Sequence, residues 1–141
     1  MDIPAVLDRL RRVASDCGLP FGTRTRTYNS RRAQELGKWA ESLNRGEEFH
    51  KAVFRAYFAD GFNIAKIPVL VELAESVGLE GVEEVLFSGT FKEAVDRDWR
   101  YSRTCGITAV PTFVAKGRVL VGAQPYDALK ELISEEGPRI S

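Results

Sequence analysis

The chain is organised around residues 105–114, which read Cys105-Gly106-Ile107-Thr108-Ala109-Val110-Pro111-Thr112-Phe113-Val114. A helical pattern ends at Gly106, since glycine is the usual residue just past a helix C-terminus. An apolar strand follows the turn, and Pro111 suits its first position because proline has no N–H to give to a sheet. Proline in a tight turn is the usual site of a cis peptide bond, and the sequence leaves the isomer open.

A hairpin and a final helix follow this stretch. The apolar segments 112–115 and 118–121 are separated by Lys116-Gly117, which predicts two strands joined by a tight turn. Pro125 then predicts the start of a helix over 125–134. Because two strands alone form a marginal sheet, we expect a second copy of the chain, a separate N-terminal polypeptide or rearranged helices to cover the apolar strand edge.

The residues before this stretch predict helices. In 3–16, apolar residues recur at three- and four-residue spacing. Further helices are expected over about 30–43, 47–59, 68–77, 80–87 and 91–104. The last of these should start at a capping box formed by Thr90 and Glu93.

Two sets of side chains are predicted for the core of these helices. The helix over 30–43 should turn one face inward, and this face holds Ala33, Leu36, Gly37, Ala40 and Leu43. A set of aromatic residues should also be buried, or should alternatively line an apolar groove over a functional site: Phe49, Phe54, Phe58, Trp99 and Tyr101.

Composition and charge indicate one soluble globular domain. The 141 residues are 44% hydrophobic and 28% charged, with a net charge of zero, which argues against a general nucleic-acid binder. Residues 1–32 carry seven arginines and three aspartates. This local excess could form a basic arm for nucleic acid, but a solvated helix face with salt bridges is the favoured interpretation. No apolar run could span a membrane and no signal peptide precedes the first helix, so we expect a cytoplasmic protein.

The chain holds two cysteines and one histidine. Cys17 and Cys105 lie 88 positions apart, and a dedicated metal site is not expected with so few ligands. Both cysteines follow helix ends, where the helix dipole disfavours a thiolate. A buried structural thiol is therefore the favoured interpretation, although Cys105 is kept as a candidate reactive thiol. His50 is interpreted as a packing or surface residue.

The ordered set of motifs resembles the DsbA-like branch of the thioredoxin superfamily, in particular its FrnE-like and 2-hydroxychromene-2-carboxylate isomerase-like members. The resemblance rests on the stretch Gly106–Val114 and the hairpin and Gly122–Pro125 after it, and on the upstream segments Gly18–Phe21, Tyr28–Ser30 and Phe54–Phe58. It implies an α/β fold of the thioredoxin type, in which this chain supplies the C-terminal ββα portion and a large helical insertion. We expect a single domain, with the helical region over 1–104, the proline loop, hairpin and last helix over 105–136, and a tail over 137–141.

The resemblance also implies a substrate site without a nucleophile. Family members carry Cys-x-x-Cys, or a serine variant, at the start of their first helix, and this sequence has neither. No catalytic residue is therefore assigned. The residues that match the family's substrate-binding loop are Ala109, Val110, Pro111 and Thr112, which would hold an extended peptide or glutathione through backbone groups.

Three functions stay open from the sequence. The first is a DsbA-like or FrnE-like thiol–disulfide oxidoreductase or isomerase, in which this chain carries the substrate-binding portion and is redox-inactive by itself. The second is a glutathione-dependent isomerase of the 2-hydroxychromene-2-carboxylate type. The third is a non-catalytic binding or assembly module. A thiol or disulfide protein, or glutathione, is the expected partner; no cofactor, nucleic acid or membrane is expected. The chain should form a homo-oligomer or pair with an N-terminal half through its sheet edge.

Overall fold

The computed structural model describes residues 2–134, so the predicted tail over 137–141 lies outside the described residues. The chain forms two compact units, Met1–Asp96 and Arg97–Ser141. The boundary falls inside one helix, and each unit is described below by itself. Among the helices of residues 2–134, none has both the length and the apolar character needed to cross a membrane.

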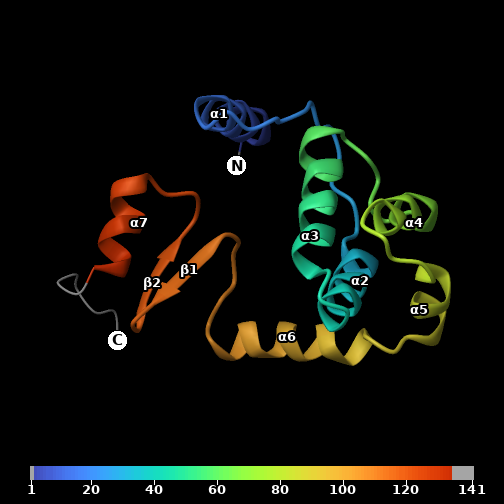
Figure 1. The fold of residues 1–141 in the computed structure, drawn as a ribbon. Helices are drawn as coiled ribbons and strands as arrows, with labels where there is room; N and C mark the ends of the chain where they lie inside the picture. Colours follow the sequence, from blue (N-terminus) through green and yellow to red (C-terminus); the bar gives the residue numbers. More distant parts are fainter. Residues whose placement is uncertain (1, 135–141) are drawn as a thin grey trace. The chain divides into compact units, whose positions relative to one another are not determined.

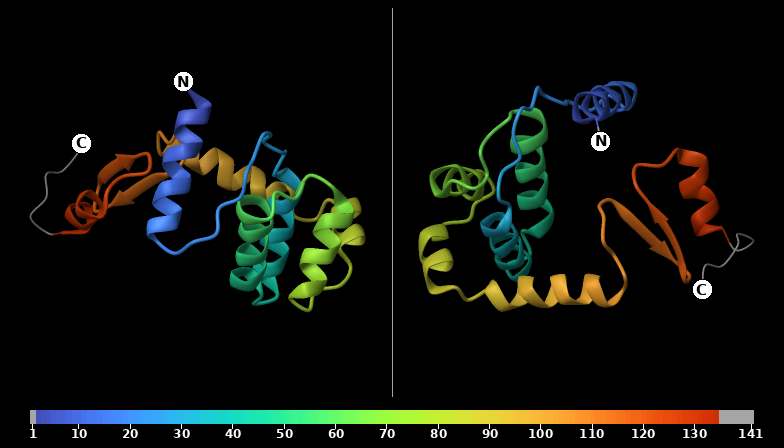
Figure 2. Two further views of the ribbon diagram at one scale, coloured as in Figure 1. Left: turned by 90° about the horizontal axis from the view of Figure 1, so that it is seen from above. Right: turned by 180° about the vertical axis from the view of Figure 1, so that it is seen from behind.

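The first unit is helical. Its elements are α1 (Ile3–Asp16), α2 (Arg31–Ser42), α3 (Gly46–Phe54), the π-helix η1 (Arg55–Ala59), α4 (Ile67–Ser76), α5 (Val82–Ser88) and the start of α6 (Lys92–Thr104). In both views α2 and α3 lie side by side (Figure 1, Figure 2), and α4 and α5 contact this pair. The predicted helices are confirmed to within a few residues at each end.

The core of the first unit lies among α2, α3, α4 and α5. Leu36 and Ala40 of α2, Phe49 of α3 and Leu70 of α4 are fully buried there. The predicted inner face of α2 is confirmed except at Leu43, which is 49% exposed. Leu43 lies at the C-cap, one position past the last helical residue, so it no longer follows the buried face.

Arg31 joins the start of α2 to the start of α6. Its Nη1 lies 2.8 Å from Asp96 Oδ1, and its Nη2 donates to the Lys92 carbonyl at 2.9 Å. Its Nε donates to Glu35, a carboxylate that is only 4% exposed. The hydrogen bond to Asp96 raises the pKa of the Arg31 guanidinium above its ordinary value. A buried carboxylate needs such a partner, and the contact with Arg31 offsets the cost of burying Glu35.

Several predicted core residues are exposed instead. Phe54 is 59% exposed and Phe58 38%, whereas the buried face follows Phe49, Val53 and Ala56. Phe54 lies five positions after Phe49, which places it well off that face. The π-turn of η1, closed by the Asp60 N–H and the Arg55 carbonyl at 3.1 Å, changes the spacing again before Phe58.

The helix α6 differs from its predicted form in two respects. Trp99 is 44% exposed and Tyr101 72%, and Val95 is the one residue of α6 that is buried within the described part of the chain. The predicted capping box is also wrong, because α6 begins at Lys92 and the Thr90 hydroxyl pairs with the hydroxyl of Ser88 at 2.8 Å. Sequence periodicity therefore predicted the helix correctly, but it did not predict the residues that cap it or those that are buried.

The second unit contains the predicted hairpin and the last helix. The strands β1 (Thr112–Ala115) and β2 (Arg118–Val121) are antiparallel, with Thr112 opposite Val121, and α7 (Tyr126–Ile133) packs on them. Lys116 and Gly117 both have positive φ, as a two-residue type I′ turn requires. Arg118 is 4% exposed and donates to the carbonyls of Glu131 and Ser134, so its side of the hairpin faces α7.

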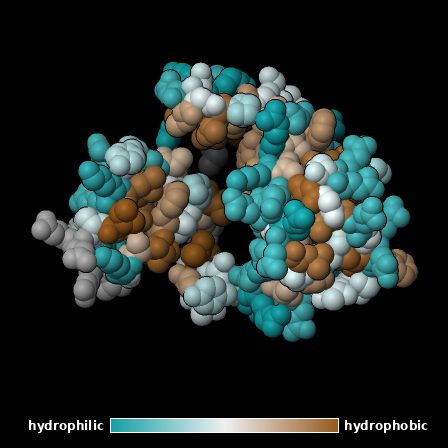
Figure 3. All heavy atoms as spheres, in the orientation of Figure 1, coloured by the Kyte–Doolittle hydropathy of each residue, from teal (hydrophilic) through white to brown (hydrophobic). Residues whose placement is uncertain are grey.

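The opposite face of the hairpin is apolar and exposed. Val114 and Val119 are paired across the strands and are 57% and 37% exposed, and Val121 on the same face is 52% exposed. Apolar side chains accordingly reach the surface of the hairpin and α7 (Figure 3). Within residues 2–134 the sheet consists of these two strands alone, and the other edge of β1 has no paired strand.

Candidate functional site

The candidate site is the loop between α6 and β1, and it begins with a defined helix end. Gly106 has φ +74°. Its N–H donates to the Arg103 carbonyl at 3.0 Å, and the Ile107 N–H donates to the Ser102 carbonyl at 3.0 Å. These two bonds form a Schellman motif, in which glycine is favoured because it adopts positive φ without steric cost. The chain thus leaves the helix at the point that the sequence predicts.

The loop 109–112 is held by two hydrogen bonds that the sequence does not reveal. The Thr112 hydroxyl donates to the Ala109 carbonyl at 2.6 Å. The Gly122 N–H, just past the end of β2, donates to the Pro111 carbonyl at 2.8 Å. The peptide bond between Val110 and Pro111 is cis. The carbonyls of Ala109 and Pro111 are therefore occupied by partners within the same unit.

Val110 stands out because its backbone groups are not occupied. The residue as a whole is 91% exposed. Within residues 2–134, neither its N–H nor its C=O makes a hydrogen bond to another residue. Backbone groups that lack a partner within the protein normally bond to water. The N–H and the C=O of Val110 are therefore open to water or to a ligand. An extended peptide can bind to such a pair as a strand does at a sheet edge.

The two cysteines are exposed, whereas the favoured prediction was that they are buried. Both cysteines are free and exposed, so the interpretation as buried structural thiols is wrong. Cys105 follows the last residue of α6, and its N–H caps the helix by donating to the Tyr101 carbonyl at 2.9 Å. Its position after a helix C-terminus gives a thiolate no help from the helix dipole. Among residues 2–134 no cluster of three or more metal-ligating side chains occurs.

An aromatic patch on the first unit is a second candidate surface, and we define it as Phe21, Phe54, Tyr57 and Phe58. The Phe54 and Phe58 rings lie 6.1 Å apart and the Phe21 and Phe58 rings 6.3 Å apart. The Arg24 guanidinium lies 4.7 Å from the Tyr57 ring centre, within the range of a cation–π contact. Phe54 and Phe58 were predicted as groove residues in the alternative interpretation, whereas no sequence signal indicated that Phe21 and Arg24 join them.

The segment that carries Phe21 and Arg24 is tied to η1. The Gly22 N–H donates to the Phe58 carbonyl at 2.8 Å. A Cβ at Gly22 would overlap the Ala59 carbonyl oxygen, so the close approach of these two backbones requires glycine. Gly22 therefore positions the extended segment against the aromatic patch.

Comparison with known protein families gives a match along the whole described part of the chain. The profile of the DSBA-like thioredoxin domain family matches residues 2–134. The uncharacterized protein YwbO of Bacillus subtilis (strain 168) is 35% identical over 101 residues, which are 70% of this chain and 50% of YwbO.

Two solved structures are similar in fold. A probable DsbA oxidoreductase of Streptomyces coelicolor has a TM-score of 0.83 and 29% identity, over 97% of this chain and 62% of that protein. A cytosolic disulfide reductase of Pseudomonas aeruginosa, DsbM, solved with GSH, has a TM-score of 0.61 and 25% identity, over 86% of this chain and 65% of that protein. The chain thus spans about half the length of YwbO and less than two thirds of each of these structures.

Proposed function

The chain belongs to the DSBA-like thioredoxin domain family, and we propose that its loop 109–112 binds the substrate in thiol–disulfide exchange. The substrate is an extended peptide with a cysteine, or glutathione. The open backbone N–H and C=O of Val110 are the observation that carries this proposal. They can pair with the backbone of an extended ligand and place its sulfur near an attacking thiol.

The exchange itself needs a thiolate that attacks one sulfur of the substrate disulfide. A new S–S bond then forms, and the other sulfur leaves as a thiolate that takes up a proton. The family's Cys-x-x-Cys would provide this thiolate, and the printed sequence does not contain that motif. We therefore propose that this chain supplies substrate binding and that it is redox-inactive by itself.

Glutathione is the small-molecule candidate. The solved structure of DsbM was determined with GSH, and its name describes a cytosolic disulfide reductase, which supports glutathione as a ligand and the cytoplasm as the location here. Glutathione has peptide N–H and C=O groups, so it could use the same backbone pair at Val110. A FrnE-like role would use this loop for a protein disulfide, and a glutathione-dependent isomerase would use it to hold the cosubstrate.

The exposed apolar face of the hairpin and the edge of β1 that is unpaired within residues 2–134 support a second proposal, which concerns how the sheet is completed. Val114, Val119 and Val121 are exposed on one face, and β1 has an open edge within the described residues. Exposed apolar strand edges readily pair with another strand. We propose that a strand from a second copy, or from an N-terminal half, completes this sheet. An assembly module without redox activity would use the same edge, and it is the non-enzymatic alternative.

A matched pair of variants tests the binding proposal. Val110→Pro removes the backbone N–H, whereas Val110→Ala shortens the exposed side chain and keeps the N–H. Calorimetric titration of the 141-residue chain with S-methylglutathione, and with a short cysteine-containing peptide, should show binding that Val110→Pro abolishes and Val110→Ala retains. If Val110→Pro binds as well as the parent chain, the backbone of Val110 does not hold the ligand.

A further inference from the structure

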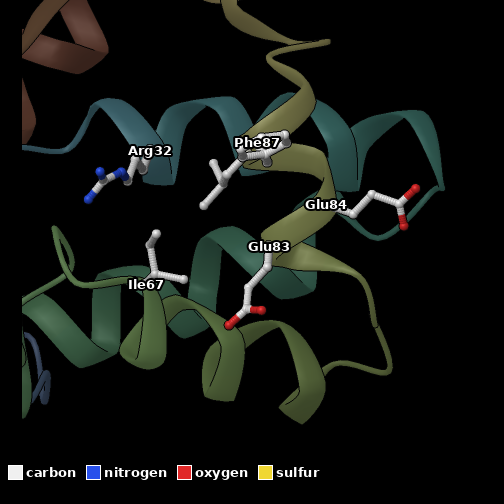
Figure 4. Close-up of a pocket in the computed structure, with 6 residues that line it drawn as sticks. Arg32, Ile67, Glu83, Glu84 and Phe87 are labelled. Atoms are coloured by element: carbon white, nitrogen blue, oxygen red, sulfur yellow. The ribbon is translucent and has the colours of Figure 1, made fainter.

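The first unit contains a cavity that the proposed function does not use. Its volume is about 640 Å³, and it is lined by Arg32, Ile67, Glu83, Glu84, Leu86 and Phe87. Figure 4 shows Arg32 on α2, Ile67 on α4 and Phe87 on α5, with the Glu83 side chain extending from α5 toward α4. All six residues belong to Met1–Asp96, whereas loop 109–112 belongs to the other unit. The cavity can therefore be tested independently of the substrate loop.

The apolar part of the cavity is Ile67, Leu86 and Phe87. Ile67 and Leu86 are half-buried, whereas Phe87 is 95% exposed and makes little contact with the rest of the chain. Covering an exposed phenylalanine ring removes apolar surface from water and is therefore favourable. A large ring at the mouth of a concave apolar surface can gain this free energy only from a bound molecule.

The charge around the cavity is mostly negative, although Arg32 lies on the lining and Lys66 and Lys92 lie at the ends of the segment 67–91. From Ile67 to Phe91 the chain has five glutamates and neither lysine nor arginine, and all five glutamates are exposed. Glu83 and Glu84 line the cavity itself. The one cationic lining residue, Arg32, donates through Nη1 to the Ala65 carbonyl at 3.0 Å. The lining therefore carries two carboxylates and one guanidinium, and this excess of negative charge favours a basic partner over an acidic one.

We infer that this cavity binds a basic amphipathic segment of a partner protein. A large apolar side chain of the segment inserts between Ile67, Leu86 and Phe87, and a neighbouring lysine or arginine faces Glu83. This is helix-in-groove recognition, in which apolar anchors give affinity and the flanking charge selects the partner. The volume of the cavity, about 640 Å³, leaves room for several side chains of the bound segment.

Fluorescence anisotropy of a labelled Leu/Lys amphipathic helical peptide tests the inference. The same peptide with glutamate in place of each lysine is the control probe. The Leu/Lys peptide should bind the full chain, Phe87→Ala should weaken this binding by about tenfold, and Glu83→Gln should weaken it by about threefold. Glu75→Gln on α4 removes the same charge away from the cavity lining and should leave the affinity nearly unchanged. Phe87 and Glu83 are exposed, so their variants should keep the parent circular dichroism spectrum.

Three results would overturn the inference. One is failure of the Leu/Lys peptide to bind. Another is equal weakening by Glu83→Gln and Glu75→Gln, which would mean general electrostatic attraction without a site. The last is a homo-oligomer that Phe87→Ala dissociates in light scattering, because the occupant would then be a second copy of this chain. None of these results bears on ligand binding at Val110.

Discussion

The backbone N–H of Gly122 donates to the carbonyl of Pro111 at 2.8 Å, and this bond joins the end of β2 to the loop before β1. It occupies the carbonyl directly after Val110 and leaves the groups of Val110 open. The loop is therefore braced on both sides of the one residue that we propose to contact the substrate.

Replacing Gly122 with alanine should loosen this brace. Gly122 has φ +90°, a conformation that costs a residue with a Cβ roughly 1–2 kcal/mol. Gly122→Ala should lower the stability of the second unit and weaken ligand binding, while Gly122→Asn should do less harm because asparagine tolerates positive φ better. Thermal denaturation and calorimetric titration measure the two effects. Unchanged stability in Gly122→Ala would show that the loop does not need this backbone geometry.

Gly22→Ala should detach the segment that carries Phe21 from η1. A Cβ there would overlap the carbonyl oxygen of Ala59, and backbone cannot move aside as a flexible side chain can. The hydrogen bond to the Phe58 carbonyl should be lost, and limited proteolysis should cut residues 19–30 faster. The neighbouring Thr23→Ala is the control, since Thr23 is exposed. Equal cleavage rates in the two variants would contradict the close packing that we describe.

Arg31→Met should destabilise the first unit. The Glu35 carboxylate is 4% exposed and would lose the guanidinium that lies 3.4 Å from it, and the tie to Asp96 would be lost as well. Removing one partner of a buried ion pair destabilises the fold more than replacing both partners. The melting temperature should therefore fall by several degrees in Arg31→Met. The double variant Arg31→Met/Glu35→Gln should recover part of this loss, and no recovery would show that Glu35 does not depend on Arg31.

The start of α3 should be sensitive to acid. Lys51 lies 2.6 Å from Glu47, and its hydrogen bond lowers the pKa of the Glu47 carboxyl in the folded chain. A carboxyl with a lowered folded pKa stabilises the fold above its unfolded pKa, and this contribution is lost as the pH falls through the folded value. Both side chains are exposed, so the effect should be small.

The matched variant Glu47→Gln removes this titration. Its melting temperature should lie slightly below that of the parent chain at pH 7, and the difference should shrink as the pH falls below the usual range for glutamate. Thermal melts at several pH values measure this difference. A difference that stays constant with pH would show that the charge of Glu47 is not its cause.

Much of the local structure could be predicted from sequence because it depends on neighbouring residues. The strands at 112–115 and 118–121 and their Lys116-Gly117 turn were predicted with their observed bounds, since short apolar segments and turn chemistry are local signals. Gly106 ends α6 for the same reason. The inner face of α2 was predicted from helical periodicity. The predicted burial of Leu43 was wrong because the helix ends one residue before it.

The exposures of some individual residues could not be predicted because they depend on distant contacts and on irregular backbone. Glu35 is buried and pairs with Arg31, and helical periodicity gives no sign that this charged residue is buried. Phe58 lies within the π-helix η1, where the α-helical spacing no longer predicts which side chains are buried, and it is 38% exposed. At the candidate site, the sequence indicated the loop around Pro111, but the open backbone of Val110 depends on which neighbouring groups Thr112 and Gly122 contact.

The most direct test of the substrate loop is an NMR titration of the ¹⁵N-labelled chain with S-methylglutathione, followed at the backbone amide of Val110. The proposed backbone contact predicts that this amide shifts most, together with its neighbours at 109 and 112, and that its solvent exchange slows on binding. The chemical shifts of the α5 amides that lie at the cavity should not change. Saturable binding that leaves the Val110 amide unshifted would contradict the account.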